Sequence, residues 1–144
     1  FRGTVMSTRA IYKFGGETQE APVDVYKHHD GYPSGAVLWI RKANKQAAHL
    51  LQDYPASPLT RRDAMIIGFL THNTGHRLIS EEKLHGDIEY VYEIQNYGNL
   101  ENEIKAYYID HDWENNTSVK KLIFTGSLDE MEEWSKGAEK WATG

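Results

Sequence analysis

The chain has 144 residues, a length that fits one domain with a substantial buried core. It contains no cysteine, which excludes disulfides, thiolate metal sites and a cysteine nucleophile. Its formal net charge of -5 disfavours nonspecific binding to nucleic acid.

The first residues differ in character from the rest of the chain. Residues 1–5 precede the first methionine, Met6, and we interpret them as a remnant of an expression vector. We expect residues 6–144 to form a single α+β domain. The sequence contains no apolar run of the roughly 20 residues that a membrane helix needs and no hydrophobic signal core. We therefore expect a cytoplasmic protein of the host cell that binds no membrane.

Alternating apolar and polar residues predict two strands near the start. They cover residues 8–14 and 23–28, and the polar stretch between them predicts an antiparallel hairpin. One face of the second strand carries Val23, Val25 and Lys27. The same alternation would place His28 and His29 on opposite sides of the sheet.

A sharp turn then leads into a long helix. Asp30-Gly31 is a turn dipeptide, and Pro33 suits the first turn of a helix because its missing N–H costs nothing there. Apolar residues recur at a spacing of three or four as far as Leu50. Pro55 disfavours helical geometry in the residue before it, so we expect the helix to end there.

Capping residues predict the remaining helices, and the alternation of apolar and polar residues predicts the remaining strands. Thr60 with Asp63 predicts the start of a second, largely apolar helix, and Ser127 with Glu130 predicts the start of a third. Three further strands are predicted over residues 88–94, 104–110 and 119–124. The predicted fold class is α+β: an antiparallel sheet of about five strands in the order ββααβββα, with the helices mainly on one face.

The first third of the chain also contains a distinctive pair of motifs. Met6-Ser7-Thr8-Arg9 is followed by a strand and then by His28-His29-Asp30-Gly31-Tyr32-Pro33. This combination resembles a family of small phage and bacterial proteins, without established activity, that open with Met-Ser-Thr-Arg and carry a His-x-Asp-Gly-Tyr-Pro turn. The resemblance covers residues 6–40. It implies a phage or prophage origin and no particular mechanism.

The turn at residues 28–32 is the leading candidate site. Titratable residues, an aromatic residue and a turn glycine lie together there, just before the start of a helix. Arg9 on the neighbouring strand would supply an anion-binding fork if the register of the hairpin brings it to this turn. The predicted ligand-binding residues are Arg9, His28, His29, Asp30, Gly31 and Tyr32. A structural explanation competes with this one: Asp30 caps the turn, Gly31 supplies a special backbone angle and Tyr32 packs.

A metal site is the alternative use of the same turn. His28, His29 and Asp30 would then serve a metal-dependent phosphoester hydrolase, alone or with a second group at the end of a later strand. That second group is Asp110, His111 and Asp112. His72 and His76 have the i, i+4 spacing of a helical metal pair, but the glutamate of a zinc-protease helix is missing.

We therefore carry two hypotheses from different classes. The leading one is a non-enzymatic binding protein of phage origin that acts on a host protein or a small ligand and needs no cofactor. The rival is the metal-dependent hydrolase, so the sequence leaves open whether the protein is an enzyme. The tyrosine pairs Tyr90/Tyr92 and Tyr107/Tyr108 offer an aromatic recognition face, although packing between sheet and helices explains them as well.

Overall fold

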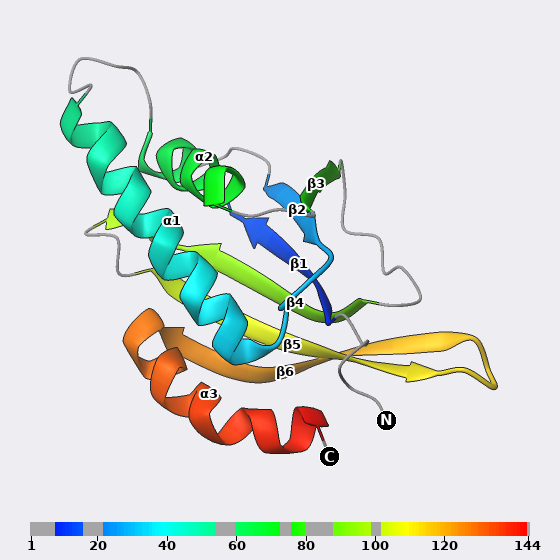
Figure 1. Cartoon of the computed structure of the whole chain (residues 1–144). Helices are drawn as coiled ribbons and strands as arrows, with labels where there is room; N and C mark the ends of the chain where they lie inside the picture. The colour runs from blue at the N-terminus through cyan, green and yellow to red at the C-terminus, as the bar shows by residue number, and fades with distance from the viewer. Residues whose placement is uncertain are drawn as a thin grey trace.

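The computed structural model describes residues 8–15, 22–53, 60–72, 76–79, 88–98 and 102–143, with side chains as far as residue 71 in the third range, none in the fourth and as far as residue 137 in the last. Within these ranges the chain forms six strands and three helices (Figure 1). They are β1 (Arg9–Phe14), β2 (Val23–Lys27), α1 (Pro33–Asp53), α2 (Arg61–His72), β3 (His76–Ile79), β4 (Ile88–Gln95), β5 (Glu103–Asp112), β6 (Thr117–Ser127) and α3 (Leu128–Thr143).

The six strands form one mixed sheet in the order β3-β2-β1-β4-β5-β6. The α+β class is confirmed, but the prediction of an antiparallel sheet is wrong at the centre, where β1 and β4 run parallel. The other neighbouring strands are antiparallel. The chain leaves β2 through α1 and α2 and returns as β3 at the outer edge of the hairpin. β4 then pairs with the other side of β1. The strand β1 therefore lies between β2 and β4 in the middle of the sheet.

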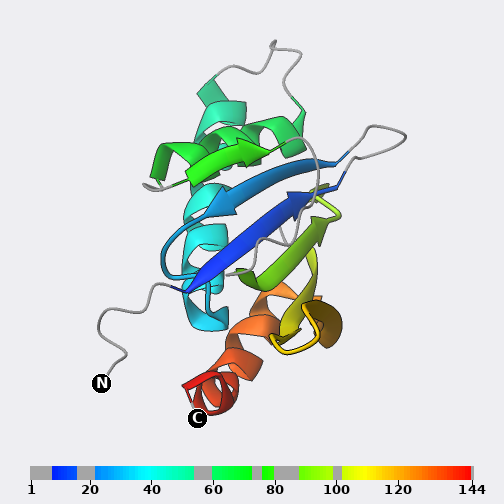
Figure 2. The same cartoon turned by 90° about the vertical axis from the view of Figure 1, so that its right-hand side faces the viewer.

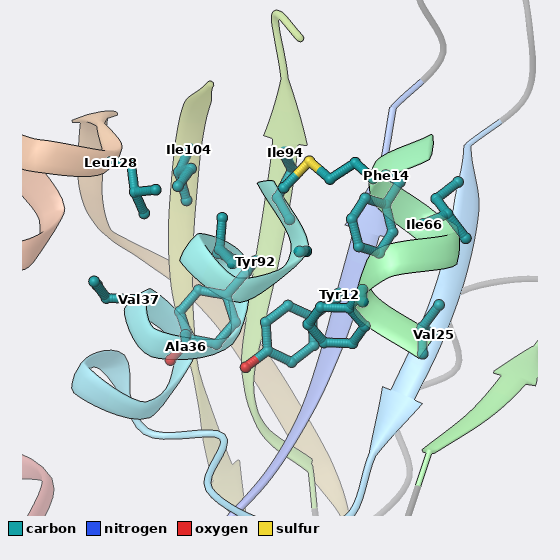
Figure 3. Packing of buried hydrophobic residues seen from close by; sticks show 14 of the residues in the cluster. Tyr12, Phe14, Val25, Ala36, Val37, Ile66, Tyr92, Ile94, Ile104 and Leu128 are labelled. Atoms are coloured by element: carbon teal, nitrogen blue, oxygen red, sulfur yellow. The ribbon is translucent and has the colours of Figure 1, made fainter. Parts of the chain in front are cut away.

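The main core lies between one face of the sheet and the helices. Tyr12 of β1 packs between Phe69 of α2 and Tyr92 of β4, with ring centroids 4.6 Å and 5.2 Å away (Figure 3). Leu128 and Met131 bring α3 into the same cluster. All three helices therefore contribute to one core on this face, as predicted.

The opposite face of the sheet carries a smaller apolar cluster. It consists of Ile11, Tyr26, Ile88, Val91 and Ile109, with Tyr107 at its border. In Figure 2 the strands lie in front of α1, so the two faces can be told apart. Tyr90, Tyr92 and Tyr108 belong to the main core, and Tyr107 points the other way. The packing explanation of the tyrosine pairs therefore holds for the first three, and the pairs do not form one aromatic face.

The predicted caps are present at two helices. The Asp63 amide donates to Thr60 Oγ1 at 3.0 Å, at the start of α2. At the start of α3 the bonds are reciprocal: the Ser127 amide donates to Glu130 Oε1 at 2.9 Å and the Glu130 amide donates to Ser127 Oγ at 3.2 Å. The first backbone N–H groups of a helix have no hydrogen-bond acceptor within the helix, and these bonds provide one.

Some predictions concern parts of the chain that the structure does not describe. Residues 1–5 lie outside the described ranges, and so do the side chains of His72 and His76. Of the helices in the described part, none combines the length and the apolar character required to cross a membrane.

Candidate binding site at the β2–α1 turn

The turn between β2 and α1 is held against the start of β1 by the backbone of Gly31. Its amide donates to the Thr8 carbonyl at 2.9 Å, and the buried Tyr92 hydroxyl donates to its carbonyl at 2.6 Å. A Cβ atom on Gly31 would lie 2.7 Å from Ala10 Cβ and 2.8 Å from the Thr8 oxygen, closer than real Cβ atoms approach such neighbours. Gly31 is therefore required for close packing, and both of its backbone polar groups are already used.

The special backbone angle of the turn belongs to Asp30. Its φ is 57°, in the left-handed region, whereas the sequence had suggested Gly31 for this role. A residue other than glycine in this conformation is strained by about 1–2 kcal/mol, although aspartate and asparagine tolerate it best. The other described non-glycine residues with positive φ are all asparagines, Asn96, Asn102 and Asn116. Among the described non-glycine residues with positive φ, Asp30 is thus the one with a charged side chain.

Arg9 and Tyr26 fix the ring of His28. The distance from Arg9 Nε to His28 Nδ1 is 3.2 Å, and the Tyr26 hydroxyl lies 2.9 Å from the same nitrogen. Because a guanidinium N–H can only donate, Nδ1 must be the acceptor. His28 is then the neutral tautomer with its proton on Nε2. The structure thus places Arg9 against the turn, on the face of the sheet opposite the helices.

The two histidines of the turn lie side by side. Their ring centroids are 4.7 Å apart and the rings meet at 84°, edge to face. The prediction that they point to opposite sides of the sheet is wrong, because β2 ends at Lys27 and the alternation of a strand stops there. The side chains of His29 and Asp30 are exposed, and Tyr32 is half-buried. Its hydroxyl lies 3.5 Å from Asp30 Oδ1, at the outer limit of a hydrogen bond.

Two tyrosine hydroxyls from the core point towards this turn. Figure 3 shows those of Tyr12 and Tyr92 directed to the end of the core from which α1 starts. The Tyr92 hydroxyl bonds to Gly31, but that of Tyr12 is buried and has no hydrogen-bond partner among the described residues. Burial raises the pKa of Tyr12 far above its ordinary value, and the nearby Asp30 and Tyr32 raise it further.

Removing these two hydroxyls should change stability in opposite directions. Tyr12→Phe deletes a buried polar group without a partner, so we expect the free energy of unfolding to rise by about 1 kcal/mol. Tyr92→Phe leaves the Gly31 carbonyl without its buried donor, so we expect a loss of about 1–2 kcal/mol. Urea unfolding of both variants beside the parent measures the two values. Equal losses in both variants would contradict the unpartnered state of the Tyr12 hydroxyl.

The acidic end of β5 does not join the turn in a metal site. Asp110 forms an ion pair with Lys121 at 2.8 Å. His111 Nε2 donates to the Ile88 carbonyl at 2.7 Å, and its Nδ1 lies 2.8 Å from Ser118 Oγ. Asp112 accepts from Asn115 in the β5–β6 turn, which lowers the pKa of its carboxyl. Among the described residues no three His, Asp or Glu side chains are grouped as metal ligands, so the hydrolase alternative gains no support from the geometry.

Sequence reasoning did not bring together three residues that lie beside the turn, Lys27, Trp39 and Lys42. Lys27 is only 2% exposed, with Nζ 4.6 Å from the centroid of the Trp39 ring. Lys42 Nζ lies 4.7 Å from the same centroid. Burial lowers the pKa of Lys27, although the charge of Asp30 opposes this shift. A signal was present in the sequence, because Lys27 shares its strand face with Val23 and Val25, and that face turns towards the core.

Comparison with known proteins identifies no relative: no protein-family model, curated protein or solved structure matches the chain. The phage origin that the Met-Ser-Thr-Arg and His-x-Asp-Gly-Tyr-Pro motifs imply stays a prediction. The function has to be inferred from the residues of the turn and their immediate neighbours.

Proposed function

We propose that the chain is a binding protein of phage origin that recognises a host protein or a small ligand through the turn at residues 28–32. One observation carries the proposal. Asp30 keeps a carboxylate in a left-handed conformation, in an exposed position, on a turn whose backbone is anchored to β1 and β4. Strain retained at an anchored, exposed residue is typical of functional positions.

The state of His28 favours binding over acid–base chemistry. Its Nδ1 lone pair already accepts from Arg9 and Tyr26, so this nitrogen is not available as a general base. The opposite nitrogen carries the proton and is therefore a hydrogen-bond donor, not a base. The exposed His29 and Asp30 add a second donor or acceptor and a negative charge. A rigid group of this kind binds with little loss of conformational entropy.

The matched variants Asp30→Asn and His29→Ala test this function. Asparagine has the shape of aspartate and tolerates the left-handed conformation, so Asp30→Asn removes the charge without disturbing the turn. Tagged parent and variants are incubated with a bacterial lysate, and the bound proteins and small molecules are identified by mass spectrometry. We expect a partner that the parent retains about tenfold better than either variant.

The control is His49→Ala, which removes an exposed histidine from α1, near the opposite end of that helix. We expect it to retain the partner as the parent does. Circular dichroism of all variants confirms that they fold alike. If Asp30→Asn and His29→Ala retain the same molecules in the same amounts as the parent, the turn is not the binding site.

A further inference from the structure

Two lysines flank one tryptophan beside the turn. Lys27 at the end of β2 and Lys42 in α1 place their ammonium groups 4.6 Å and 4.7 Å from the centroid of the Trp39 ring. Each ammonium is attracted by the face of the indole ring, but the two like charges repel each other. Positive charge is thus concentrated at one point of a chain whose formal net charge is -5.

Burial makes this arrangement unfavourable unless something balances it. Lys27 is 2% exposed, and among the described residues neither Lys27 nor Lys42 forms an ion pair with a carboxylate. A buried ammonium without a counter-charge loses hydration, and a cation–π contact replaces only part of it. Burial accordingly lowers the pKa of Lys27, and the field of Asp30 opposes this shift.

The indole adds a buried donor. Trp39 Nε1 is buried and has no hydrogen-bond acceptor among the described residues. Buried N–H groups almost always find an acceptor in a native protein. The Lys27 ammonium and the indole N–H therefore lie beside each other without an acceptor that carries negative charge, and the exposed Lys42 adds positive charge at the same ring.

We propose that Lys27, Lys42 and Trp39 bind an oxyanion, a carboxylate or phosphate group, of the ligand that the β2–α1 turn recognises. This inference rests on the proposed function and names the chemistry of its ligand. Trp39 Nε1 donates a hydrogen bond to the oxyanion and Lys27 supplies a buried counter-charge. Lys42 is the exposed member of the three, so the oxyanion enters on its side.

The indole signal of Trp39 reports directly on this site. The chain has four tryptophans, whose indole N–H groups appear as separate signals in a nitrogen–proton correlation spectrum, and Trp39→Phe identifies the one from Trp39. Inorganic phosphate and acetate are titrated separately at constant ionic strength, with chloride as the balancing anion. We expect a saturable shift of the Trp39 signal with at least one of them. Saturation with phosphate alone identifies a phosphate site, and saturation with acetate identifies a carboxylate site.

Three variants decide whether the lysines are responsible. Lys27→Met keeps the volume of the side chain, and we expect it to weaken binding of the oxyanion at least about tenfold. Lys42→Gln should weaken binding about two- to fivefold, because an exposed charge contributes less. Lys45→Gln, at an exposed lysine further along α1, should change nothing. The backbone signals in the same spectra show whether each variant is folded.

The proposal is overturned if neither oxyanion shifts the Trp39 signal saturably, if chloride shifts it equally, or if the shift is unchanged in Lys27→Met. The proposed function fails in a different experiment. If the phosphate or acetate shift depends on Lys27 while Asp30→Asn and His29→Ala retain every partner, the oxyanion site stands and the turn is not part of it.

Discussion

Replacing Gly31 with valine should cost about 3 kcal/mol of stability, more than replacing either neighbouring histidine with alanine. The Cβ atom alone would lie 2.7 Å from Ala10 Cβ and 2.8 Å from the Thr8 oxygen. Relief of this overlap has to pull the turn away from β1, which breaks the bond from the Gly31 amide to Thr8 and the bond from Tyr92 to the Gly31 carbonyl. For a domain of this size the melting temperature should fall by about 10 °C.

The histidine variants should be milder because they remove contacts and add none. His29→Ala removes an exposed side chain and should cost within about 0.5 kcal/mol. His28→Ala leaves Arg9 and Tyr26 without their shared acceptor and should cost about 1 kcal/mol.

Two controls separate crowding at Gly31 from backbone conformation. Asp30→Gly removes the left-handed strain at the adjacent position, so it should be neutral or stabilise by up to about 1 kcal/mol. Gly137→Ala adds a methyl group where no atom lies within 4 Å, in the exposed part of α3, and should stabilise by about 0.5–1 kcal/mol. Thermal unfolding of all five variants tests the set. If Gly31→Val melts with the parent, the turn is not packed against β1 in the way described.

Local features of the fold could be predicted from sequence because local chemistry determines them. The caps at Thr60 and Ser127 each join residues three positions apart, so the sequence pattern contains both partners of each bond. The start of α1 at Pro33 follows from the same kind of reasoning. The pairing of β1 with β4 could not be predicted in this way, because it joins residues about 80 positions apart. Alternation is also the same in parallel and antiparallel strands.

The candidate site was located by sequence, but its geometry was not. An Asp-Gly pair indicates a turn but does not show which of its two residues is left-handed. In the structure Asp30 has the left-handed φ, and position 31 requires glycine because Ala10 leaves no room for a Cβ atom. The contact of Arg9 with His28 depends on the register of β1 and β2, which no local pattern fixes. β3 was missed because four residues are too few to show periodicity.

Stability should fall steeply above pH 10 because three tyrosines in the core cannot ionise while the chain is folded. Tyr12, Tyr90 and Tyr92 are at most 1% exposed. Burial raises the pKa of each well above its ordinary value, with smaller contributions from neighbouring acidic groups. In the unfolded chain the same hydroxyls ionise near pH 10, at about their ordinary value. Above that pH the folded chain holds more protons than the unfolded one, so rising pH favours unfolding.

The expected slope follows from the number of groups. Each tyrosine contributes a loss of about 1.4 kcal/mol per pH unit once the unfolded form is ionised, so the three together give about 4 kcal/mol per unit. A domain with an ordinary stability of about 5–15 kcal/mol then unfolds within roughly two to four units above pH 10, whereas these groups add no pH dependence between about pH 7 and 9. Urea unfolding at a series of alkaline pH values measures the slope.

Tyr12→Phe and Tyr90→Phe should each reduce the alkaline slope by about a third, since each removes one of the three linked protons. Neither change should alter the pH dependence near neutrality. The ultraviolet absorbance of tyrosinate provides an independent measurement, because these three hydroxyls should ionise only as the chain unfolds. The linkage argument is wrong if all nine tyrosines of the chain ionise near pH 10 while circular dichroism still shows the folded state. Such a result would mean that water reaches the core between β1, β4 and the helices, and that the hydroxyls directed at the β2–α1 turn are not buried in solution.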